Sequence, residues 1–231
     1  MTLGAANNIA LVSPDVTFDD LFDKNNPDYV NDVFGNIGTN DCVIAARAHH
    51  TIRLDYDPAT PILVIATAEV IEEFLGQSQG SDTGGINPFD SLSNWKDPGW
   101  IAGAAMGFTQ KRKIDDFGFV DVPGIGDGSG TPMPESAIDL VKTAIVSHSG
   151  AHFTLNLPGG IGPPNNKSFG WNNPWTDLNA GSAANSHTML LTGYDTLGPV
   201  GITWGQRQRM SWDFLYTYGA SLFWVRKGAS T

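Results

Sequence analysis

The sequence predicts an α+β domain in which a helical first half packs against an antiparallel β-sheet formed by the second half. Helical spacing of apolar residues dominates residues 35–110, whereas residues 111–231 contain several short runs typical of strands. The 27 glycines and 14 prolines indicate many turns and argue against a helical bundle. Helices followed by strands are typical of an α+β arrangement, and a cleft between two such halves suits a functional site.

We expect two regions, an N-terminal arm over residues 1–34 and a single domain over residues 35–231. The arm is polar and rich in turn signals, with one helical turn expected at residues 17–22. We expect it to wrap the domain or to contact an assembly partner.

The stretch from residue 35 to residue 54 combines a glycine-containing loop with an alanine-rich helical pattern. Thr39, Asn40 and Asp41 can each cap a helix, so the helix should begin within a residue or two of Cys42, the only cysteine. The positive end of the helix dipole and the unpaired N–H groups there favour the thiolate, which is the nucleophilic form. A lone cysteine can equally be an inert core residue, so position alone leaves both interpretations open.

The rest of the first half should contain two shorter helical segments. Residues 67–75 read as a helix with Thr67 as its cap and Gly76 as its stop, and residues 76–91 as a loop. Part of residues 92–108, centred on 98–105, is expected to be helical.

The second half should supply the sheet. We expect a helix at 134–146, because a proline stands near its start and apolar residues follow at helical spacing. A long Gly/Asn/Pro loop at 158–186 suggests a function, since structureless loops of this length are uncommon in compact domains. The other elements expected are strands at 113–122, 151–157, 188–195, 200–205 and 221–225, and a helix at 211–218.

A thiolate nucleophile needs a base, and the base needs an orienting group. His187 is the candidate base, because we expect it to open the strand that follows the long loop. A histidine there can project into a cleft while its strand holds it. Taken alone, it is more often a surface residue.

Several motifs occur in the order found in the papain-like cysteine peptidases, and the sequence resembles that superfamily from about residue 35 onwards. Asn36 lies six residues before Cys42, which is the spacing of the oxyanion-hole glutamine in that superfamily. Residues 187–195 resemble its catalytic-histidine strand, and residues 203–205 resemble its Asn-Ser-Trp-Gly stretch. The helix expected at 134–146 and the strand after it match the unit upstream of the histidine. Residues 40–46 and 203–206 also resemble a divergent bacterial and phage group.

The resemblance implies a catalytic set of Cys42, His187, Asn36 and an orienting residue, with no cofactor and no metal. The sequence departs from the family pattern at Asn36, which has a shorter reach than glutamine although it keeps an N–H₂ donor. The usual asparagine before the tryptophan is also missing, and either Ile202 or Thr203 could occupy its place. We favour Thr203, because a hydroxyl can accept a hydrogen bond from the imidazole and Ile202 cannot. No cysteines flank Cys42 to form a disulfide, which fits an intracellular or virion setting.

The net charge and the remaining histidine motifs argue against nucleic-acid, membrane and zinc-binding functions. The formal net charge of −11 argues against nucleic-acid and anionic-membrane partners, and we see no signal peptide or membrane-spanning run. His148 and His152 have metal-ligand spacing, but the helix should end between them, so we expect no zinc site. Of the adjacent His49 and His50, we expect one beside the core and the other facing solvent.

The sequence therefore predicts a cysteine-dependent peptidase or amidase that acts on a peptide or isopeptide bond in a protein or peptide substrate. The alternative is a catalytically silent papain-like module, for example a phage virion component that binds its partner through residues 1–34. A cytoplasmic or virion-associated location fits both.

Overall fold

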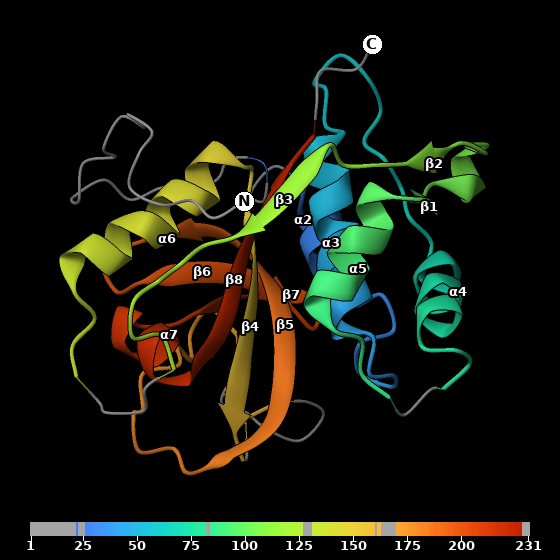
Figure 1. Ribbon diagram of the computed structural model, residues 1–231. Coiled ribbons are helices and arrows are strands. Elements are labelled where there is room, and N and C mark those ends of the chain that lie inside the picture. The colour runs from blue at the N-terminus through green and yellow to red at the C-terminus, as the bar shows by residue number, and fades with distance from the viewer. Residues whose placement is uncertain are drawn as a thin grey trace.

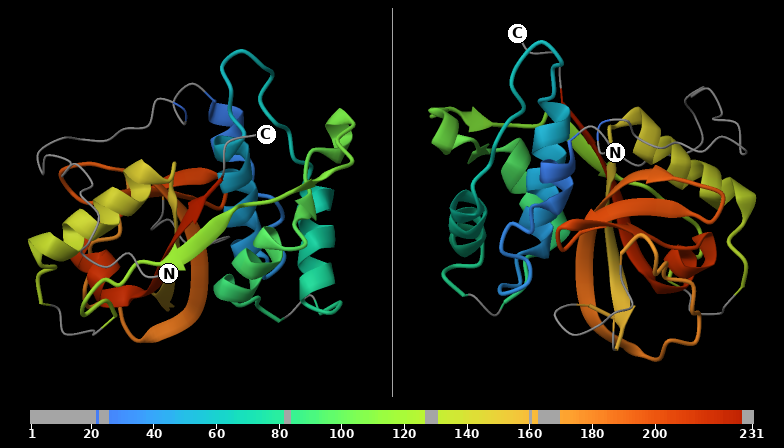
Figure 2. Two further views of the ribbon diagram at one scale, coloured as in Figure 1. Left: turned by 45° about the horizontal axis from the view of Figure 1, so that its top comes forward. Right: turned by 180° about the vertical axis from the view of Figure 1, so that it is seen from behind.

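The computed structural model of the chain describes residue 22 and residues 26–81, 84–126, 131–159, 161–162 and 170–227. Its elements form two halves that lie side by side in every view (Figures 1 and 2). Most of the expected N-terminal arm, including most of the expected turn at 17–22, lies outside the described residues.

The first half is built around one central helix. α3 (Cys42–Leu54) contacts α4 (Thr67–Gln77) and α5 (Pro88–Lys96) on one side and the sheet on the other. The short helix α2 (Pro27–Asn31) precedes it. A hairpin of β1 (Trp100–Ile101) and β2 (Lys111–Arg112) follows, with a 3-10 turn, η1 (Ala104–Met106), between its strands.

The second half is a six-stranded sheet in which every neighbouring pair is antiparallel. Two helices, α6 (Glu135–Ser147) and α7 (Trp212–Tyr218), pack on it. The α+β arrangement expected from the sequence is therefore confirmed. In spatial order the strands are β3 (Asp116–Phe119), β8 (Gly219–Arg226), β4 (Ala151–Pro158), β5 (Ala183–Tyr194), β6 (Pro199–Thr203) and β7 (Gln206–Arg209).

Both faces of this sheet are covered, because successive side chains of a strand point to opposite faces. In β8, Leu222 and Trp224 join the core beneath α6 and α7, whereas Phe223 and Val225 join the core around α3 and α5. α3 thus lies on one face of the sheet and α6 on the other. The N-terminal end of α3 lies against β5, where Cys42 interacts with Thr188.

Two buried side chains of α3 attach it to the turn between α6 and β4. His50 Nε2 lies 2.9 Å from the carbonyl oxygen of His148, and Arg53 Nε donates to that of Ser149 at 2.7 Å. Ser149 has a positive φ of 57°, so this turn presents two successive carbonyls to the helix. These bonds fix α3 along its axis, and so fix Cys42 about 16 Å away at the other end.

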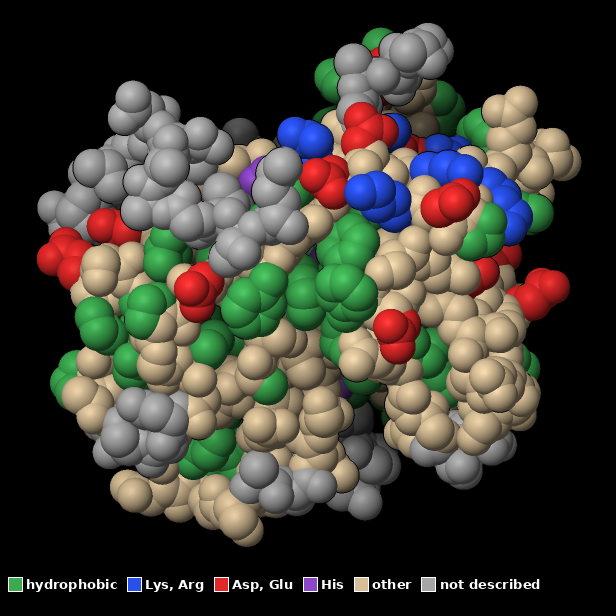
Figure 3. Space-filling model, viewed as in Figure 1, with side chains coloured by type: hydrophobic (Ala, Val, Ile, Leu, Met, Phe, Trp, Pro, Cys, Tyr) green, Lys and Arg blue, Asp and Glu red, His purple; other side chains and the backbone are tan. Residues whose placement is uncertain are grey.

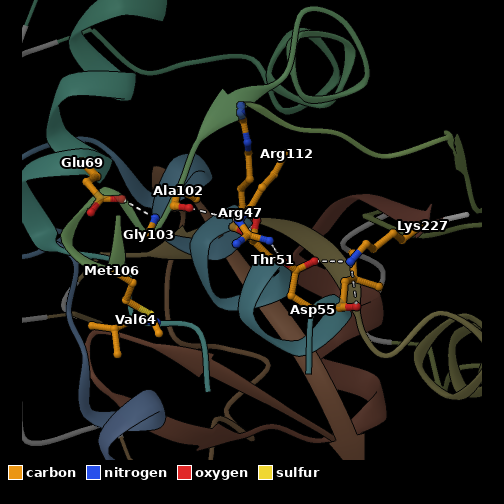
Figure 4. Close-up of polar contacts among 11 residues, drawn as sticks. Arg47, Thr51, Asp55, Val64, Glu69, Ala102, Gly103, Met106, Arg112 and Lys227 are labelled. Atoms are coloured by element: carbon orange, nitrogen blue, oxygen red, sulfur yellow. Dashed lines mark hydrogen bonds and ion pairs between the residues drawn. The ribbon is translucent and has the colours of Figure 1, made fainter. Parts of the chain in front are cut away.

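A second set of polar contacts ties the hairpin to the helices (Figure 4). Glu69 of α4 accepts a hydrogen bond from the backbone N–H of Gly103 at 2.6 Å, and Arg112 donates to the carbonyl of Ala102 at 3.0 Å. The guanidinium of Arg112 and the ammonium of Lys227 both pair with Asp55, just beyond the end of α3. The hairpin, α3 and the end of β8 therefore form one connected corner.

Basic side chains are concentrated at that corner, although the chain as a whole is acidic (Figure 3). Lys111, Arg112, Lys113 and Lys227 line a pocket of about 330 Å³ there. Asp55, which pairs with two of these cations, also lines the pocket. The corner lies at the far end of α3 from Cys42.

Helix boundaries in the first half differ from expectation. α4 continues through Gly76 to Gln77, because an exposed glycine costs a helix only about 1 kcal/mol. α5 begins earlier than expected, at Pro88, where the Asn87 side chain caps it by accepting from the N–H of Phe89. Residues 98–105, expected to be partly helical, instead form β1 and the start of η1, after Gly99 with φ of 79°.

The expectation that one of the two adjacent histidines faces solvent is wrong. Both His49 and His50 are buried, at 3% and 0% exposure. His49 packs between the rings of Tyr29 and Phe34, which precede α3 in the chain. An amphipathic pattern predicts a solvent face, but here the segment before α3 covers that face.

Candidate active site

Cys42 is the first residue of α3, with Asp41 as the N-cap. Its side chain is half-buried, and its sulfur interacts with the backbone N–H and the hydroxyl of Thr188 on β5. Burial raises the pKa of the Cys42 thiol, these hydrogen bonds lower it in part, and the negative charge of Asp41 raises it further. The expectation of a lowered thiol pKa is therefore wrong, because desolvation of the thiolate outweighs the helix N-terminus.

His187 lies inside β5, opposite Leu155 of β4, rather than at the strand's opening as expected. Its imidazole is 5% exposed, and burial lowers its pKa to about 3. The ring is therefore neutral at physiological pH. Its Nε2 atom lies 2.6 Å from the hydroxyl oxygen of Thr203.

Thr203 is the last residue of β6, and its hydroxyl, not the side chain of Ile202, faces the imidazole. Ile202 points to the opposite face of the sheet and joins the core around α3. The next residue, Trp204, has a positive φ of 48° and stacks on His187 with ring centroids 4.3 Å apart. The imidazole is thus held by a hydrogen bond at one nitrogen and by an indole over its face.

Asn36 lies in the tight loop that leads into α3. The N–H groups of Gly38 and Thr39 both donate to the carbonyl of Gly35, at 2.9 and 3.2 Å, and Asn36 N–H donates to Val33 at 3.1 Å. Asn36 is 9% exposed within this loop. The loop therefore holds Asn36 in a buried position six residues before Cys42.

The structure brings the helix tip and the strand together at Thr188, the residue after His187. Among the described residues no hydrogen bond joins the Cys42 sulfur to the imidazole. Sequence reasoning missed the two residues that contact or influence the sulfur most directly, Thr188 and Asp41. Both are sequence neighbours of predicted site residues, but only the fold shows that Thr188 faces the thiol.

No group of three or more His, Cys, Asp or Glu side chains within the described ranges could hold a metal ion. His148 stacks on Trp224, whereas His152 lies among His50 and Trp95. None of the helices described is both long and apolar enough to cross a membrane.

Comparison with known proteins is informative at the level of structure. No protein-family model matches the sequence, and no curated protein matches it significantly. Xylellain, a cysteine protease from Xylella fastidiosa, superimposes with a TM-score of 0.57 at 13% identity, covering 82% of this chain and 80% of xylellain.

Two plant cysteine proteases give similar results. The Carica candamarcensis protease CMS1MS2 matches with a TM-score of 0.53 at 13% identity, over 83% of this chain and 91% of its own. The proform of the ragweed pollen protease Amb a 11 matches with a TM-score of 0.54 at 15% identity, over 96% of this chain and 69% of its own. Together with the order of helices and strands, these matches show that the chain has the fold of the papain-like cysteine peptidases.

Proposed function

We propose that the protein is a cysteine-dependent peptidase or amidase that hydrolyses a peptide or isopeptide bond. Cys42 is the nucleophile, His187 the general base, Thr203 the residue that orients it, and Asn36 a donor to the oxyanion. The observation that carries the proposal is the buried His187–Thr203 hydrogen bond of 2.6 Å, covered by Trp204, on the strand that contacts Cys42.

The hydrogen bond decides which nitrogen of His187 can act. When Nε2–H donates to the Thr203 hydroxyl oxygen, Nδ1 carries no proton and is free to accept one. The raised thiol pKa and the lowered imidazole pKa mean that the pair rests as neutral thiol and neutral imidazole. The Cys42 proton must therefore reach Nδ1 as the sulfur attacks, which requires the two side chains to approach each other from their present positions.

The remaining steps follow from this arrangement. The sulfur bonds to the carbonyl carbon, and the oxygen of the tetrahedral intermediate accepts hydrogen bonds from the Cys42 N–H and the Asn36 amide. Protonated His187 gives its proton to the leaving amine, and the C–N bond breaks. Water then attacks the thioester with His187 again as base, releasing the acid and restoring the thiol.

The burial of the thiol favours a second candidate function. A raised Cys42 pKa and the absence of a Cys42–His187 hydrogen bond within the described residues fit a papain-like module that binds a partner without chemistry, such as a virion component. In that case Cys42 and His187 are packing residues, and their replacement should affect stability alone.

Turnover of a pooled library of peptides, followed by mass spectrometry, separates the two functions. For the peptidase we expect cleavage products with the wild type and none with Cys42→Ala or His187→Ala, both folded by circular dichroism. A covalent adduct of substrate mass minus the leaving amine should accumulate on Cys42 after acid quenching. Cleavage that persists in Cys42→Ala, or a wild type inert towards every peptide and isopeptide tested, would reject the proposal.

Replacing Thr203 by valine should lower kcat about a hundredfold, because the buried imidazole loses the hydrogen bond that sets its tautomer and orientation. Thr217→Val is the matched control, since the buried Thr217 hydroxyl has no hydrogen-bond partner within the described part of the chain. Steady-state kinetics of the two variants should show a large loss only for Thr203→Val. Equal kcat values would remove Thr203 from the mechanism.

A further inference from the structure

Asp41, the residue before Cys42, is a buried carboxyl group that the mechanism above does not use. It is 0% exposed, and neither carboxyl oxygen has a hydrogen-bond partner that meets normal geometry in the described part of the chain. Although it occupies the N-cap position, its side chain makes no capping bond. A buried carboxyl group without such partners is costly and calls for an explanation.

The carboxyl group of Asp41 lies beside Gly35, at the start of the loop that carries Asn36. A Cβ atom on Gly35, which has a φ of 90°, would come within 3.0 Å of Asp41 Oδ2, so the carboxyl group needs the space that a glycine leaves. The Thr39 hydroxyl donates to the carbonyl of Gly35 at 3.1 Å and is also close enough to the Asp41 carboxyl group to influence it. Asp41, Thr39 and Gly35 therefore form one cluster at the base of the loop.

We propose that Asp41 is a positioning residue that couples the reactivity of Cys42 to the Asn36 loop by switching the Thr39 hydroxyl between two acceptors. As a neutral acid, Asp41 donates to the Thr39 oxygen, which donates to Gly35 and closes the loop. As a carboxylate, Asp41 accepts from the Thr39 hydroxyl, and the Gly35 carbonyl loses that donor. The effect on turnover rests on the proposed function, whereas the effect on the thiol does not.

The two states should both be populated near neutral pH. Burial raises the pKa of Asp41 to about 6, and the Thr39 hydroxyl and the N–H of Asp41 itself offset only part of that rise. Cys42 is the titratable group that Asp41 influences, and the ionised carboxylate raises the thiol pKa. The neighbours from other elements, Ile71 of α4 beside Gly35 and Thr188 of β5 beside the sulfur, carry no charge.

The rate of Cys42 alkylation by iodoacetamide between pH 5.5 and 8.5 tests the proposal. For the wild type we expect the logarithm of the rate to rise with unit slope, flatten near pH 6 to 7 as Asp41 ionises, and then rise again. Asp41→Asn, which mimics the neutral acid, should give a single straight rise. At pH 8 it should react about tenfold faster than the wild type, because the negative charge that raises the thiol pKa is absent. The two rates should converge at pH 5.5.

The matched control is Asp32→Asn, which removes another partly buried carboxyl group with a raised pKa before α3 and should leave the wild-type profile unchanged. Asp41→Ala removes both the charge and the hydrogen-bond donor. In this variant Cys42 should be alkylated rapidly by iodoacetamide, whereas peptide hydrolysis should be slower than in Asp41→Asn.

Titration of ¹³C-labelled aspartate by NMR in the wild type needs no variant and should show one carboxyl group that titrates near pH 6. A straight wild-type profile, a superimposable Asp41→Asn profile, or no carboxyl titrating above pH 5 would each overturn the proposal. A wild type without hydrolysis but with these profiles would overturn only the peptidase assignment.

Discussion

Lowering the pH from 7 to 5 should remove most of the free energy of unfolding. All five histidines have a lowered pKa in the folded chain, to about 3 for His49 and His187, to about 4 for His50, and well below 6.5 for His152, with burial as the largest cause in each. The unfolded chain binds protons at these sites below pH 6.5, whereas the folded chain does not until the pH approaches the lowered values. Stability is therefore complete above pH 6.5 and is lost as the pH falls towards 4.

The size of this effect follows from the pKa values. Each of the four most buried histidines costs about 2 kcal/mol at pH 5, or about 8 kcal/mol together, which is comparable to the whole stability of a typical domain. Asp41 acts in the opposite direction, because its pKa is raised in the folded chain. Its protonation between pH 7 and pH 5 increases the free energy of unfolding by about 1 kcal/mol. The histidines outweigh it.

Urea unfolding followed by tryptophan fluorescence at pH 7.5, 6.0, 5.5 and 5.0 measures this dependence. The slope of the free energy of unfolding against pH should correspond to about three protons taken up on unfolding between pH 6 and 5. His49→Phe, placed among the rings of Tyr29 and Phe34, should reduce the uptake by about one proton. An uptake of one proton or fewer in the wild type would contradict the buried, neutral state of these side chains.

The fold was predictable because its main signals are local and ordered along the chain. The amphipathic pattern after Cys42 and the proline before residue 135 predicted α3 and α6 to within about a residue, and short apolar runs predicted β4, β5 and β8. Thr203 was preferred to Ile202 because its hydroxyl can accept a hydrogen bond from the imidazole and the Ile202 side chain cannot. In the structure the Thr203 hydroxyl is the one that faces His187.

What the sequence could not supply were the properties set by burial from distant segments. A helix N-terminus favours a thiolate, but burial of Cys42 in the folded chain reverses the direction of its pKa shift. An amphipathic helix suggests one polar face, but α3 is enclosed, so that His49, His50 and Arg47 are all buried. Local pattern reports which residues form an element, whereas the environment of a titratable group depends on everything packed around it.

Arg47 shows the largest consequence of that enclosure. It is 0% exposed in the middle of α3, with its guanidinium over the rings of Trp95 and Trp100 at 5.5 and 4.7 Å. Its charge is paired with Glu73 of α4 at 3.1 Å, and Nη1 donates to the Ser91 carbonyl at 3.4 Å. Burial lowers the pKa of Arg47 to about 9 even with the carboxylate in place.

Glu73→Ala should therefore cost about 3 to 5 kcal/mol of stability, because it leaves a buried cation without its counter-charge. Glu72→Ala is the matched control on the same helix, since Glu72 is exposed and should change stability by less than about 0.5 kcal/mol. Chemical denaturation of both variants at pH 7.5 measures the difference. The double variant Arg47→Met/Glu73→Ala should recover part of the loss, because the uncompensated charge is then absent. If Glu73→Ala is no worse than Glu72→Ala, Arg47 does not depend on Glu73, and the link between α3 and α4 is apolar packing.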